Sequence, residues 1–584
     1  MSKPRDVARI LGRTEAANPN NSALSLAGST EPTTQYDSIG LLPVTGLTAG
    51  TQAFVTSTNR LYVSNGSGWY NTALINATPA LSLSSSGTIA LTPGSATTIT
   101  MTATDSDNAD ANLVLSLESG GDLFKFATVS QDSSVVTITP RTEDSASTLG
   151  SDGSATLTFK ASDGINQATV QNTFTLAFGP DWTGSLTESK IVASDAQASD
   201  YFGASVEISG DGSYAISGAW GEDAGGSGAG AAYIFLRTGS SWAQQAKLTA
   251  SDAQASDYFS YSEAVSISTD GTYAAVGAML EATGGTFAGA GYIFVRSGTS
   301  WSQQAKLVAS NPSAYDKFGY AASISGDGSY AIFGADGEDT TASGSGAAYV
   351  YVRSGTSWSQ QQMLKATDAG ANHNFGHSTY MSTDGTYAIV GAYDGDNTAG
   401  NYLGKAYIFT RSGTTWSQQA KLTASDAAAG DKFGYTVAIN DDGTYAIVGT
   451  PYQDTGGADA GAAYIYVRSG TSWTQQAKIQ SSDIGADHAF AASVSISGDG
   501  SHVMVGARKV DTGASNAGAA YIFKRSGSSW SQIKKLQAAD LAADDNFGSS
   551  VSISSSDGTY SIVGADGEDA GGSAAGAAYI FEAG

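Results

Sequence analysis

Cysteine is absent from the 584 residues, which excludes disulfide frameworks, thiolate zinc sites and cysteine nucleophiles. Basic residues are scarce, because 28 Lys and Arg stand against 54 Asp and Glu and give a formal net charge of −26. Nucleic-acid binding depends on cations that neutralise phosphates, and anionic lipid surfaces repel an acidic chain, so neither partner is expected. No stretch reaches the roughly 18 consecutive apolar residues of a membrane helix, so membrane insertion is not expected either.

Sorting and catalytic motifs are also missing. Charged residues interrupt the apolar piece at the start of the chain, so we expect no secretory leader and a protein that stays where it is made or leaves by lysis. There is no Gly-x-Ser-x-Gly, His-Glu-x-x-His or phosphate-binding glycine loop. Carboxylates are plentiful enough to leave a glycosidase-like pair open. We nevertheless expect a protein that is not an enzyme. The sequence identifies no cofactor with certainty, and Ca²⁺ is the candidate considered below.

What is present is an internal repeat. A tryptophan recurs every 57 to 60 residues, at Trp182, Trp242, Trp301, Trp358, Trp416, Trp473 and Trp530. Each interval contains four strand-like runs separated by turn residues, and Asp-Gly supplies the first tight turn. Four short antiparallel strands per repeat are typical of a propeller blade. The strand at Trp182 precedes the first blade and none follows the last, so we predict that it closes the ring, because a closed ring removes exposed sheet edges. The predicted fold class is all-β, with a seven-bladed β-propeller over residues 181–584.

The repeats resemble the FG-GAP family, which includes the head of integrin α chains. Five blades carry Phe-Gly at the start of the first strand, whereas two carry Phe259-Ser260 and Phe490-Ala491. Six blades carry Gly-Ala in the second strand, and one carries Gly449-Thr450. The resemblance implies binding and adhesion more than catalysis. The calcium loop of integrin blades does not carry over, because the connection between the first two strands is only a short turn here.

Acidic residues collect in two sets of loops, which a blade places at the same end. We predict a binding face from these loops, to which Trp220 is added because it stands beside an acidic loop outside the repeating set. Its residues are Asp195, Asp200, Trp220, Glu222, Asp223, Asp252, Asp257, Asp426, Asp431, Asp454, Asp545, Glu568 and Asp569. Two interpretations stay open for the carboxylates: they cap turns and keep the surface soluble, or they bind Ca²⁺. The recurring Phe, Tyr and Trp residues are predicted to form the core between blades.

Residues 78–180 contain alternating runs that predict a seven-strand sandwich. This segment resembles cadherin-like domains of the dystroglycan type. The resemblance makes Asp105, Asp107 and Asp163 candidate Ca²⁺ ligands, with ordinary turn residues as the alternative.

Residues 1–37 are predicted to form an N-terminal arm, and residues 38–77 a small hairpin set with its turn at Asn65-Gly66. Both segments resemble the N-terminal regions of virion fibre proteins of marine tailed phages, particularly those of cyanobacteria. The resemblance implies attachment to other virion proteins and a homo-oligomer, with a trimer favoured.

These features lead to one expected function and two alternatives. The expected function is a virion appendage that is anchored by its N-terminal region and displays the propeller to bind a glycan or protein on the host surface. The first alternative is a capsid or neck decoration without a receptor role. The second is a bacterial cell-surface adhesin.

Overall fold

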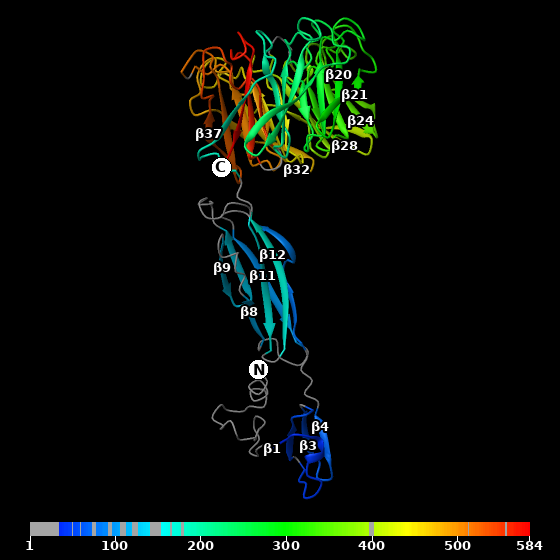
Figure 1. Cartoon of the computed structure of the whole chain (residues 1–584), viewed down its shortest axis with the longest axis vertical. Helices are drawn as coiled ribbons and strands as arrows, with labels where there is room; N and C mark the ends of the chain where they lie inside the picture. Colours follow the sequence, from blue (N-terminus) through cyan, green and yellow to red (C-terminus); the bar gives the residue numbers. More distant parts are fainter. Residues whose placement is uncertain are drawn as a thin grey trace. The chain divides into compact units, whose positions relative to one another are not determined.

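The computed structural model describes residues 34–49, 51–58, 60–72, 78–91, 96–105, 113–118, 127–140, 153–163, 166–176, 180–395, 402–511, 513–554 and 558–583. Strands, turns and loops make up nearly all of them, and the helical element that they contain is the short 3-10 helix η1 (Ile39–Leu41), so the predicted all-β class is confirmed. The chain divides into two compact units, Met1–Phe178 and Gly179–Gly584 (Figure 1). Within the described ranges, no helix has the length and hydrophobicity that crossing a bilayer would require.

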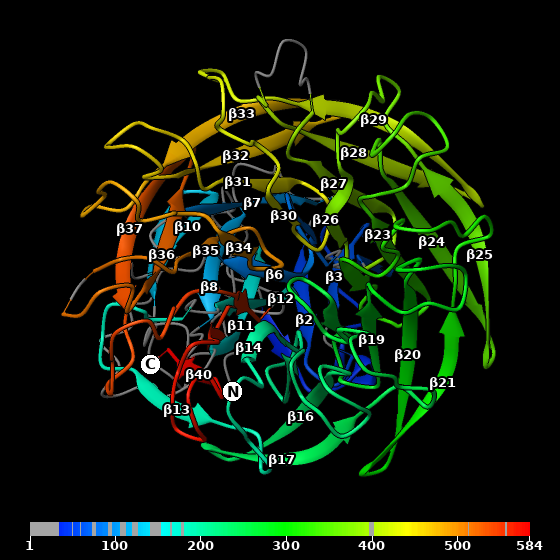
Figure 2. The same ribbon diagram turned by 90° about the horizontal axis from the view of Figure 1, so that it is seen from above.

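The second unit is a ring of seven four-stranded sheets, which confirms the predicted propeller. Figure 2 shows the first strands of the blades around the centre and the fourth strands on the rim. Blades 1 to 3 comprise β14 (Phe202–Ile208), β15 (Tyr214–Ala219), β16 (Ala231–Thr238) and β17 (Ser241–Leu248); β18 (Val265–Ile267), β19 (Tyr273–Ala278), β20 (Ala290–Ser297) and β21 (Ser300–Leu307); and β22 (Ala322–Ile324), β23 (Tyr330–Ala335), β24 (Ala347–Ser354) and β25 (Ser357–Leu364).

The remaining four blades follow the same order from the centre outward. They comprise β26 (Phe375–Met381), β27 (Tyr387–Ala392), β28 (Lys405–Ser412) and β29 (Thr415–Leu422); β30 (Thr436–Ile439), β31 (Tyr445–Thr450), β32 (Ala462–Ser469) and β33 (Ser472–Ile479); β34 (Ser493–Ile496), β35 (His502–Ala507), β36 (Ala519–Ser526) and β37 (Ser529–Leu536); and β38 (Val551–Ile553), β39 (Tyr560–Ala565), β40 (Ala577–Glu582) and β13 (Thr187–Ile191). The last blade thus joins strands from both ends of the unit.

Ring closure occurs as predicted, but the position of Trp182 is corrected. In blade 7, β13 pairs antiparallel with β40, and Lys190 lies opposite Tyr579 as Lys247 lies opposite Tyr233 in blade 1. The pairing of β16 with β17 contains a register shift, whereas the pairing of β40 with β13 does not. When the register is extended back from Thr187, Leu186 falls at the position where the other blades have tryptophan. Trp182 therefore lies before the strand. Its ring is fully buried, and its indole Nε1 donates to the Gly558 carbonyl at 3.0 Å.

The core lies between neighbouring blades. The cluster between blades 1 and 2, for example, contains Ile234 from one and Phe259 and Tyr292 from the other. All seven recurring Phe residues, which begin or precede the first strands, and all seven Tyr residues of the third strands are buried to 1% exposure or less, so their predicted core role is confirmed. Close packing of these rings leaves little freedom for blades to slide past each other.

The recurring tryptophans of the fourth strands pack against this core at its outer edge, and Trp416 is a buried member of it. Most are half-buried on the rim, and five of them join neighbouring blades through the indole N–H. Trp301 Nε1, for example, donates to Gln245 Oε1 of the preceding blade at 2.9 Å. The first glutamine of the Gln-Gln pair makes a second link, since Gln244 Oε1 accepts the Ser194 N–H at 2.9 Å. Side-chain hydrogen bonds at the rim thus add to the packing that joins neighbouring blades.

The Phe-Gly and Gly-Ala motifs have a common steric cause. The glycine after phenylalanine adopts a positive φ, such as +88° at Gly319, and its carbonyl oxygen abuts the Gly-Ala glycine of the preceding blade, here Gly277. A Cβ on either glycine would overlap backbone of the neighbouring blade. Two blades depart from the motif, with Ser260 at φ 70° and Ala491 at φ 69°. Both residues therefore adopt the left-handed conformation, which costs roughly 1–2 kcal/mol in an L-residue.

Ala491→Gly is therefore expected to raise the free energy of unfolding by about 1 kcal/mol, because glycine removes the left-handed strain. Ser260→Gly is the matched control. The Ser260 hydroxyl donates to the Ala231 carbonyl at 2.7 Å and accepts the Ala219 N–H at 3.1 Å, so its loss offsets the gain. Denaturant unfolding of both variants measures the difference. A lower stability of Ala491→Gly than of the parent would contradict this explanation.

The first unit contains three four-stranded sheets. The smallest comprises β1 (Thr34–Tyr36), β2 (Gln52–Val55), β3 (Arg60–Ser64) and β4 (Trp69–Thr72). The predicted turn at Asn65-Gly66 joins β3 to β4, and Asn65 Oδ1 accepts the Gly68 N–H at 2.9 Å. Because β1 pairs in parallel with β2, this sheet begins inside the predicted arm of residues 1–37; residues 1–33 of that arm lie outside the described residues.

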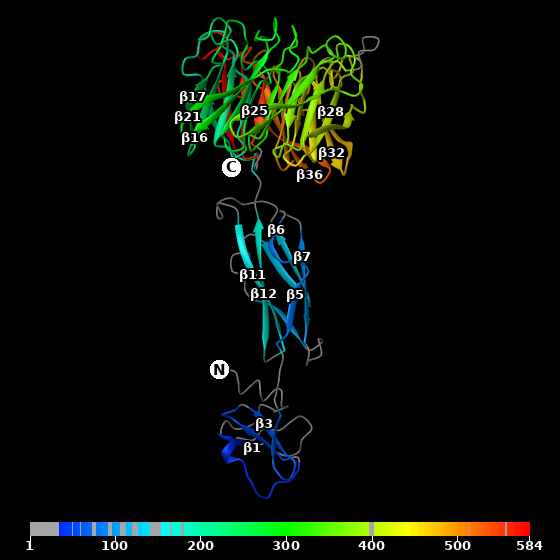
Figure 3. The ribbon, with the colours of Figure 1, turned by 90° about the vertical axis from the view of Figure 1, so that its right-hand side faces the viewer.

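The other two sheets enclose one core. Their strands are β5 (Ala80–Leu83), β7 (Thr97–Thr104), β10 (Val135–Pro140) and β9 (Ala127–Asp132) in one sheet, and β6 (Gly87–Leu91), β12 (Gln167–Leu176), β11 (Gly153–Ser162) and β8 (Val114–Glu118) in the other (Figure 3). Ile99 and Val136 from the first sheet and Phe159 and Phe174 from the second are fully buried in this core. The described strands number eight where the sequence predicted seven. The likeness to cadherin domains stays a prediction.

Candidate functional site

The predicted acidic face lies in the loops that precede the first strand and the loops that join the second and third strands of each blade. Loops of the two kinds contact each other across blades, as where the Ser256 N–H donates to the Ser227 carbonyl at 2.8 Å. The structure therefore gathers the predicted residues at one end of the ring, which we call the loop end. Their carboxylates fall into three structural groups.

The first group consists of Asp195, Asp252 and Asp426, each bound by a third-strand tyrosine and a fourth-strand lysine. Asp195 accepts from the Tyr233 hydroxyl at 2.8 Å and from Lys247 Nζ at 2.7 Å. Partial burial raises the pKa of Asp195, but the hydrogen bonds from Lys247 and Tyr233 outweigh it and hold the pKa below its ordinary value. Sequence analysis missed the lysine, although it recurs at this position in six of the seven blades, with Met363 in blade 3.

The second group consists of Asp200, Asp257, Asp431 and Asp545, whose side chains are buried. Each accepts the backbone N–H three residues earlier in its own loop; for Asp200 the donor is Gln197 at 2.7 Å. Burial is the largest influence on these carboxyls and raises their pKa values above the ordinary one. These aspartates hold the loop conformation.

The third group closes the loop between the second and third strands. Glu222 and Glu568 are buried and accept from Lys247 and Lys190, each at 2.7 Å. The following aspartate accepts the N–H five residues later, as Asp223 does from Gly228 at 2.8 Å, and the remaining members of this set are Asp454 and Asp569. Every carboxylate of the predicted face therefore has an intramolecular partner. Their role in ligand binding stays a prediction.

Trp220 belongs to a different arrangement. It follows β15 directly, is half-buried, and stacks on Tyr201 with a centroid separation of 4.4 Å and an interplanar angle of 5°. From there, ring contacts continue from blade 1 to blade 5 at centroid separations of 4.3–6.3 Å. We call this set the aromatic arc: Tyr201, Trp220, Tyr258, Tyr261, Tyr320, His377, Tyr393, Tyr435 and Tyr452. His377 and Tyr435 also line the central channel, so the arc borders the channel where its strands begin.

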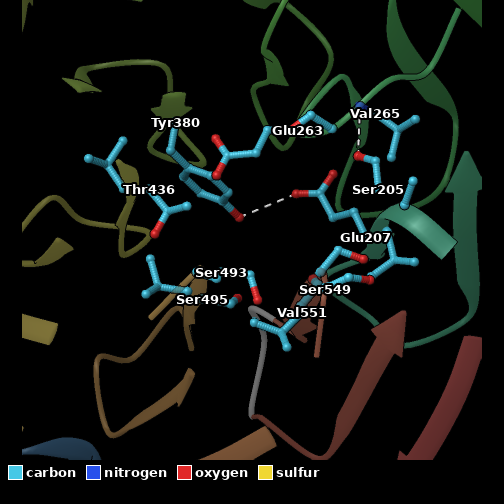
Figure 4. A pocket seen from close by; sticks show the side chains of 18 of the residues that line it. Ser205, Glu207, Glu263, Val265, Tyr380, Thr436, Ser493, Ser495, Ser549 and Val551 are labelled. Carbon is cyan, nitrogen blue, oxygen red and sulfur yellow. Dashed lines mark hydrogen bonds between the residues drawn. The ribbon is translucent and has the colours of Figure 1, made fainter. Parts of the chain in front are cut away.

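Inside the channel, Glu207, Glu263 and Tyr380 face a cavity of about 100 Å³ (Figure 4). Figure 4 shows the Tyr380 hydroxyl directed at Glu207, to which it donates at 3.3 Å. A water molecule occupies roughly 10–15 Å³ of such space, so the cavity has room for several waters. Sequence analysis missed both glutamates. Glu207 stands where other blades have Ser, Ala or Tyr, and Glu263 lies in a stretch that is two residues longer between Phe259 and Ile267 than between Phe202 and Ile208.

Glu263→Gln is expected to stabilise the propeller at about pH 8 and to change little at about pH 5. Burial raises the pKa of Glu263 to about 8, from an ordinary value of 4.5. Over this interval the folded protein holds a proton that the unfolded chain has lost, so the parent loses stability as the pH rises and glutamine does not. Asp195→Asn is the opposite control, since its lowered pKa stabilises the fold at neutral pH. Parallel pH–stability curves for parent and Glu263→Gln would contradict the assignment.

The candidate Ca²⁺ ligands of the first unit lie at strand ends. Asp105 follows β7, and Asp163 follows β11 and accepts the Asn166 N–H at 2.7 Å, whereas Asp107 lies outside the described residues. No group of three or more His, Asp or Glu side chains in the described part of the chain is arranged to hold a metal ion. Calcium binding stays a prediction, and a lower melting temperature after chelation is its test.

The chain was compared with curated proteins and with solved structures. No curated protein matches the sequence. Among solved structures, the RRP9 WD40 repeats match 70% of this chain and 99% of theirs, at 9% identity and a TM-score of 0.43. The match to the Dos1 propeller covers 74% of this chain and 89% of that one, at 14% identity and a TM-score of 0.38. The match to a functionally unknown protein from Desulfotomaculum acetoxidans covers 66% of this chain and 92% of that one, at 10% identity and a TM-score of 0.37.

The family comparison is specific to the repeats. The FG-GAP repeat profile matches residues 186–235, 242–294, 301–351, 358–409, 416–466, 473–523 and 530–581. The first match begins at Leu186, in agreement with the register of β13 and not with Trp182. Since the seven matches cover more than half of the 584 residues, the chain belongs to the FG-GAP repeat family.

Proposed function

We propose that this protein is a virion appendage of a tailed phage, attached to the particle by its N-terminal region and binding the host surface with its propeller. The observation that carries the binding role is the contrast between the two parts of each blade. The second and third strands repeat with few changes, whereas the residues around the loop end of the channel differ from blade to blade and include the aromatic arc. Regular scaffolds that vary at one end commonly use that end for recognition.

The attachment role is supported by the N-terminal resemblance to fibre proteins. The segment that carries it forms the small sheet β1–β4, in which Trp69 Nε1 donates to the Pro43 carbonyl at 2.7 Å and the adjacent Tyr70 is 62% exposed. Together with the exposed Ile39, Leu41 and Val44 of the same segment, Tyr70 offers apolar surface for subunit or virion contacts. Several copies on one particle would add avidity of roughly 10²–10⁴ to weak propeller contacts without any new contact.

Deletion of residues 1–77 is expected to convert an oligomer into a monomer, because the proposal places the subunit contacts there. Light scattering of the full chain and of the deletion variant at micromolar concentration measures this. A full chain that is already monomeric would contradict the oligomer. A deletion variant that stays oligomeric would move the contacts to the rest of the chain.

Immunogold electron microscopy tests the virion assignment. Antibody against residues 181–584 is applied to lysate from the source culture and to intact cells. The proposal expects gold at particle projections. Gold on the capsid or neck alone would favour a decoration protein. Bare particles with labelled cell envelopes would overturn the virion assignment and favour a cell-surface adhesin.

A further inference from the structure

We infer that the loop-end mouth of the propeller channel binds a neutral glycan, with the aromatic arc as its stacking platform. The inference rests on the proposed function only where it assigns that glycan to the host surface. Its structural basis is independent of the particle and consists of three observations: where the repeat varies, how the rings are arranged, and which buried polar atoms have no protein partner.

Three of the positions that vary among the repeats lie around the mouth. The residue before the first-strand Phe is Tyr201 or Tyr258 in blades 1 and 2 and Lys317 or Lys432 in blades 3 and 5. The residue two positions after that Phe is Tyr, His, Ala or Ser, depending on the blade. The residue after the Gly-Ala motif is likewise different in most blades. The buried Phe, Tyr and Gly positions beside them hardly change. Packing explains the constant positions, but it does not require tyrosine or tryptophan at the variable ones.

The arc presents rings at several orientations within one connected surface. Trp220 lies 5.0 Å from Tyr258 and 5.4 Å from Tyr261, and the chain of contacts continues from Tyr261 to Tyr320 at 6.3 Å. All of these rings are half-buried, so each is fixed by its neighbours and still partly open to solvent. Rigid, amphipathic rings bind a ligand with little loss of side-chain entropy, which suits the weakly polar C–H faces of sugars.

Polar atoms at the mouth complete the site. Asp394 and Asp566 each have one carboxylate oxygen that is buried and accepts no hydrogen bond from the residues that the structure describes, and Arg508 Nε is buried and donates none. Arg508 and Asp566 stand directly after the Gly-Ala motif of their blades, and Asp394 stands one position later. Buried polar atoms require partners, and ligand hydroxyls can supply both donors and acceptors. Aromatic rings with a few convergent polar groups are typical of ligand sites.

Charge selects a neutral glycan over an anionic one. Lys317 Nζ lies 3.8 Å from Asp336 Oδ1, and Lys432 Nζ lies over the rings of Tyr393 and Tyr452 at 5.2 and 5.0 Å. Both lysines are therefore engaged, and acidic loops surround the mouth. A sulfated or uronic-acid polymer would be repelled by these loops, whereas neutral sugar hydroxyls can donate to the carboxylates.

Affinity gel electrophoresis of the full chain tests the inference. Gels contain dextran, mannan or galactan as neutral polysaccharides, or polygalacturonate as the anionic one. We expect at least one neutral polysaccharide to retard the protein, and Trp220→Ala and Tyr320→Ala to weaken this interaction about tenfold or more. Tyr315→Ala is the matched control, because Tyr315 is 59% exposed in a neighbouring loop and lies outside the arc. It is expected to bind as the parent does.

A second pair of variants separates loss of binding from loss of folding. Tyr320→Phe keeps the ring and is expected to keep most of the binding, while Asp566→Asn keeps the shape and is expected to weaken it. Melting temperatures are measured for every variant. No retardation by any neutral polysaccharide, stronger retardation by polygalacturonate, or equal loss in Tyr315→Ala would each overturn the inference. Retained glycan binding with gold absent from particles would instead overturn only the virion assignment.

Discussion

Gly334→Ala is expected to destabilise the propeller by about 3 kcal/mol or more. Gly334 is the Gly-Ala glycine of blade 3, and a Cβ built on it would overlap the carbonyl oxygen of Gly376 in blade 4. Backbone, not a flexible side chain, occupies the space, so relief requires the two blades to separate. Overpacking in a rigid interior costs roughly 1–3 kcal/mol, and occasionally more, even where side chains can adjust. Denaturant unfolding of the propeller measures the loss.

The control is the same substitution at Gly355, in the turn between β24 and β25. Gly355 has φ +62°, and nothing lies within 4 Å of a Cβ built there. Its replacement is expected to cost only the left-handed strain, about 1 kcal/mol. Equal losses at the two positions would contradict the steric explanation of the Gly-Ala motif. A circular propeller offers no free end through which such a clash could relax.

Trp182→Ala is expected to lower the free energy of unfolding by about 3–5 kcal/mol, the usual cost of removing a large buried ring. The indole is fully buried in the core that blades 6 and 7 share, and its loss also leaves the Gly558 carbonyl without the bond that closes this region. Trp301→Ala is the control, because the Trp301 ring is half-buried on the rim. It is expected to cost clearly less.

Thermal or denaturant unfolding followed by tryptophan fluorescence and circular dichroism gives both values. The account predicts that Trp182→Ala also loosens β13, so proteolysis near residue 187 is expected to accelerate in this variant and not in Trp301→Ala. Equal stability of the two variants would contradict the closing role of Trp182. Ring closure would then depend on the β13–β40 pairing and on contacts such as the ion pair of Lys190 with Asp540.

The repeat made most of the fold predictable. Seven copies of Phe and Tyr at constant spacing identify core positions, because a residue that packs between blades cannot vary freely. Trp182 misled the alignment: it resembles the fourth-strand tryptophans in spacing, whereas the register places Leu186 at their position. The other fourth strands contain one bulge residue that β13 lacks, so equal spacing along the sequence does not mean an equal position in the strand. A bulge leaves no clear trace in a single sequence.

The candidate site was harder to predict, since residue type does not reveal its partner. Asp195 and Asp200 look alike in sequence, yet one accepts from Lys247 and Tyr233 and the other from a backbone N–H. Only Trp220 of the arc was recognised, because the other rings occupy variable positions that resemble noise between strong motifs. The useful signal is departure from the repeat: Tyr261, Tyr320 and Tyr435 stand at one repeat position that is Ala or Ser in three other blades.

Competition for adsorption tests the central claim most directly. Host cells are incubated with the purified full chain before phage from the source culture is added, and unadsorbed phage is counted. The account predicts that the parent protein and Tyr315→Ala reduce adsorption, and that Trp220→Ala at the same concentration does not. Undiminished adsorption at concentrations where the parent protein coats the cells would contradict the claim that the propeller mouth binds the host receptor.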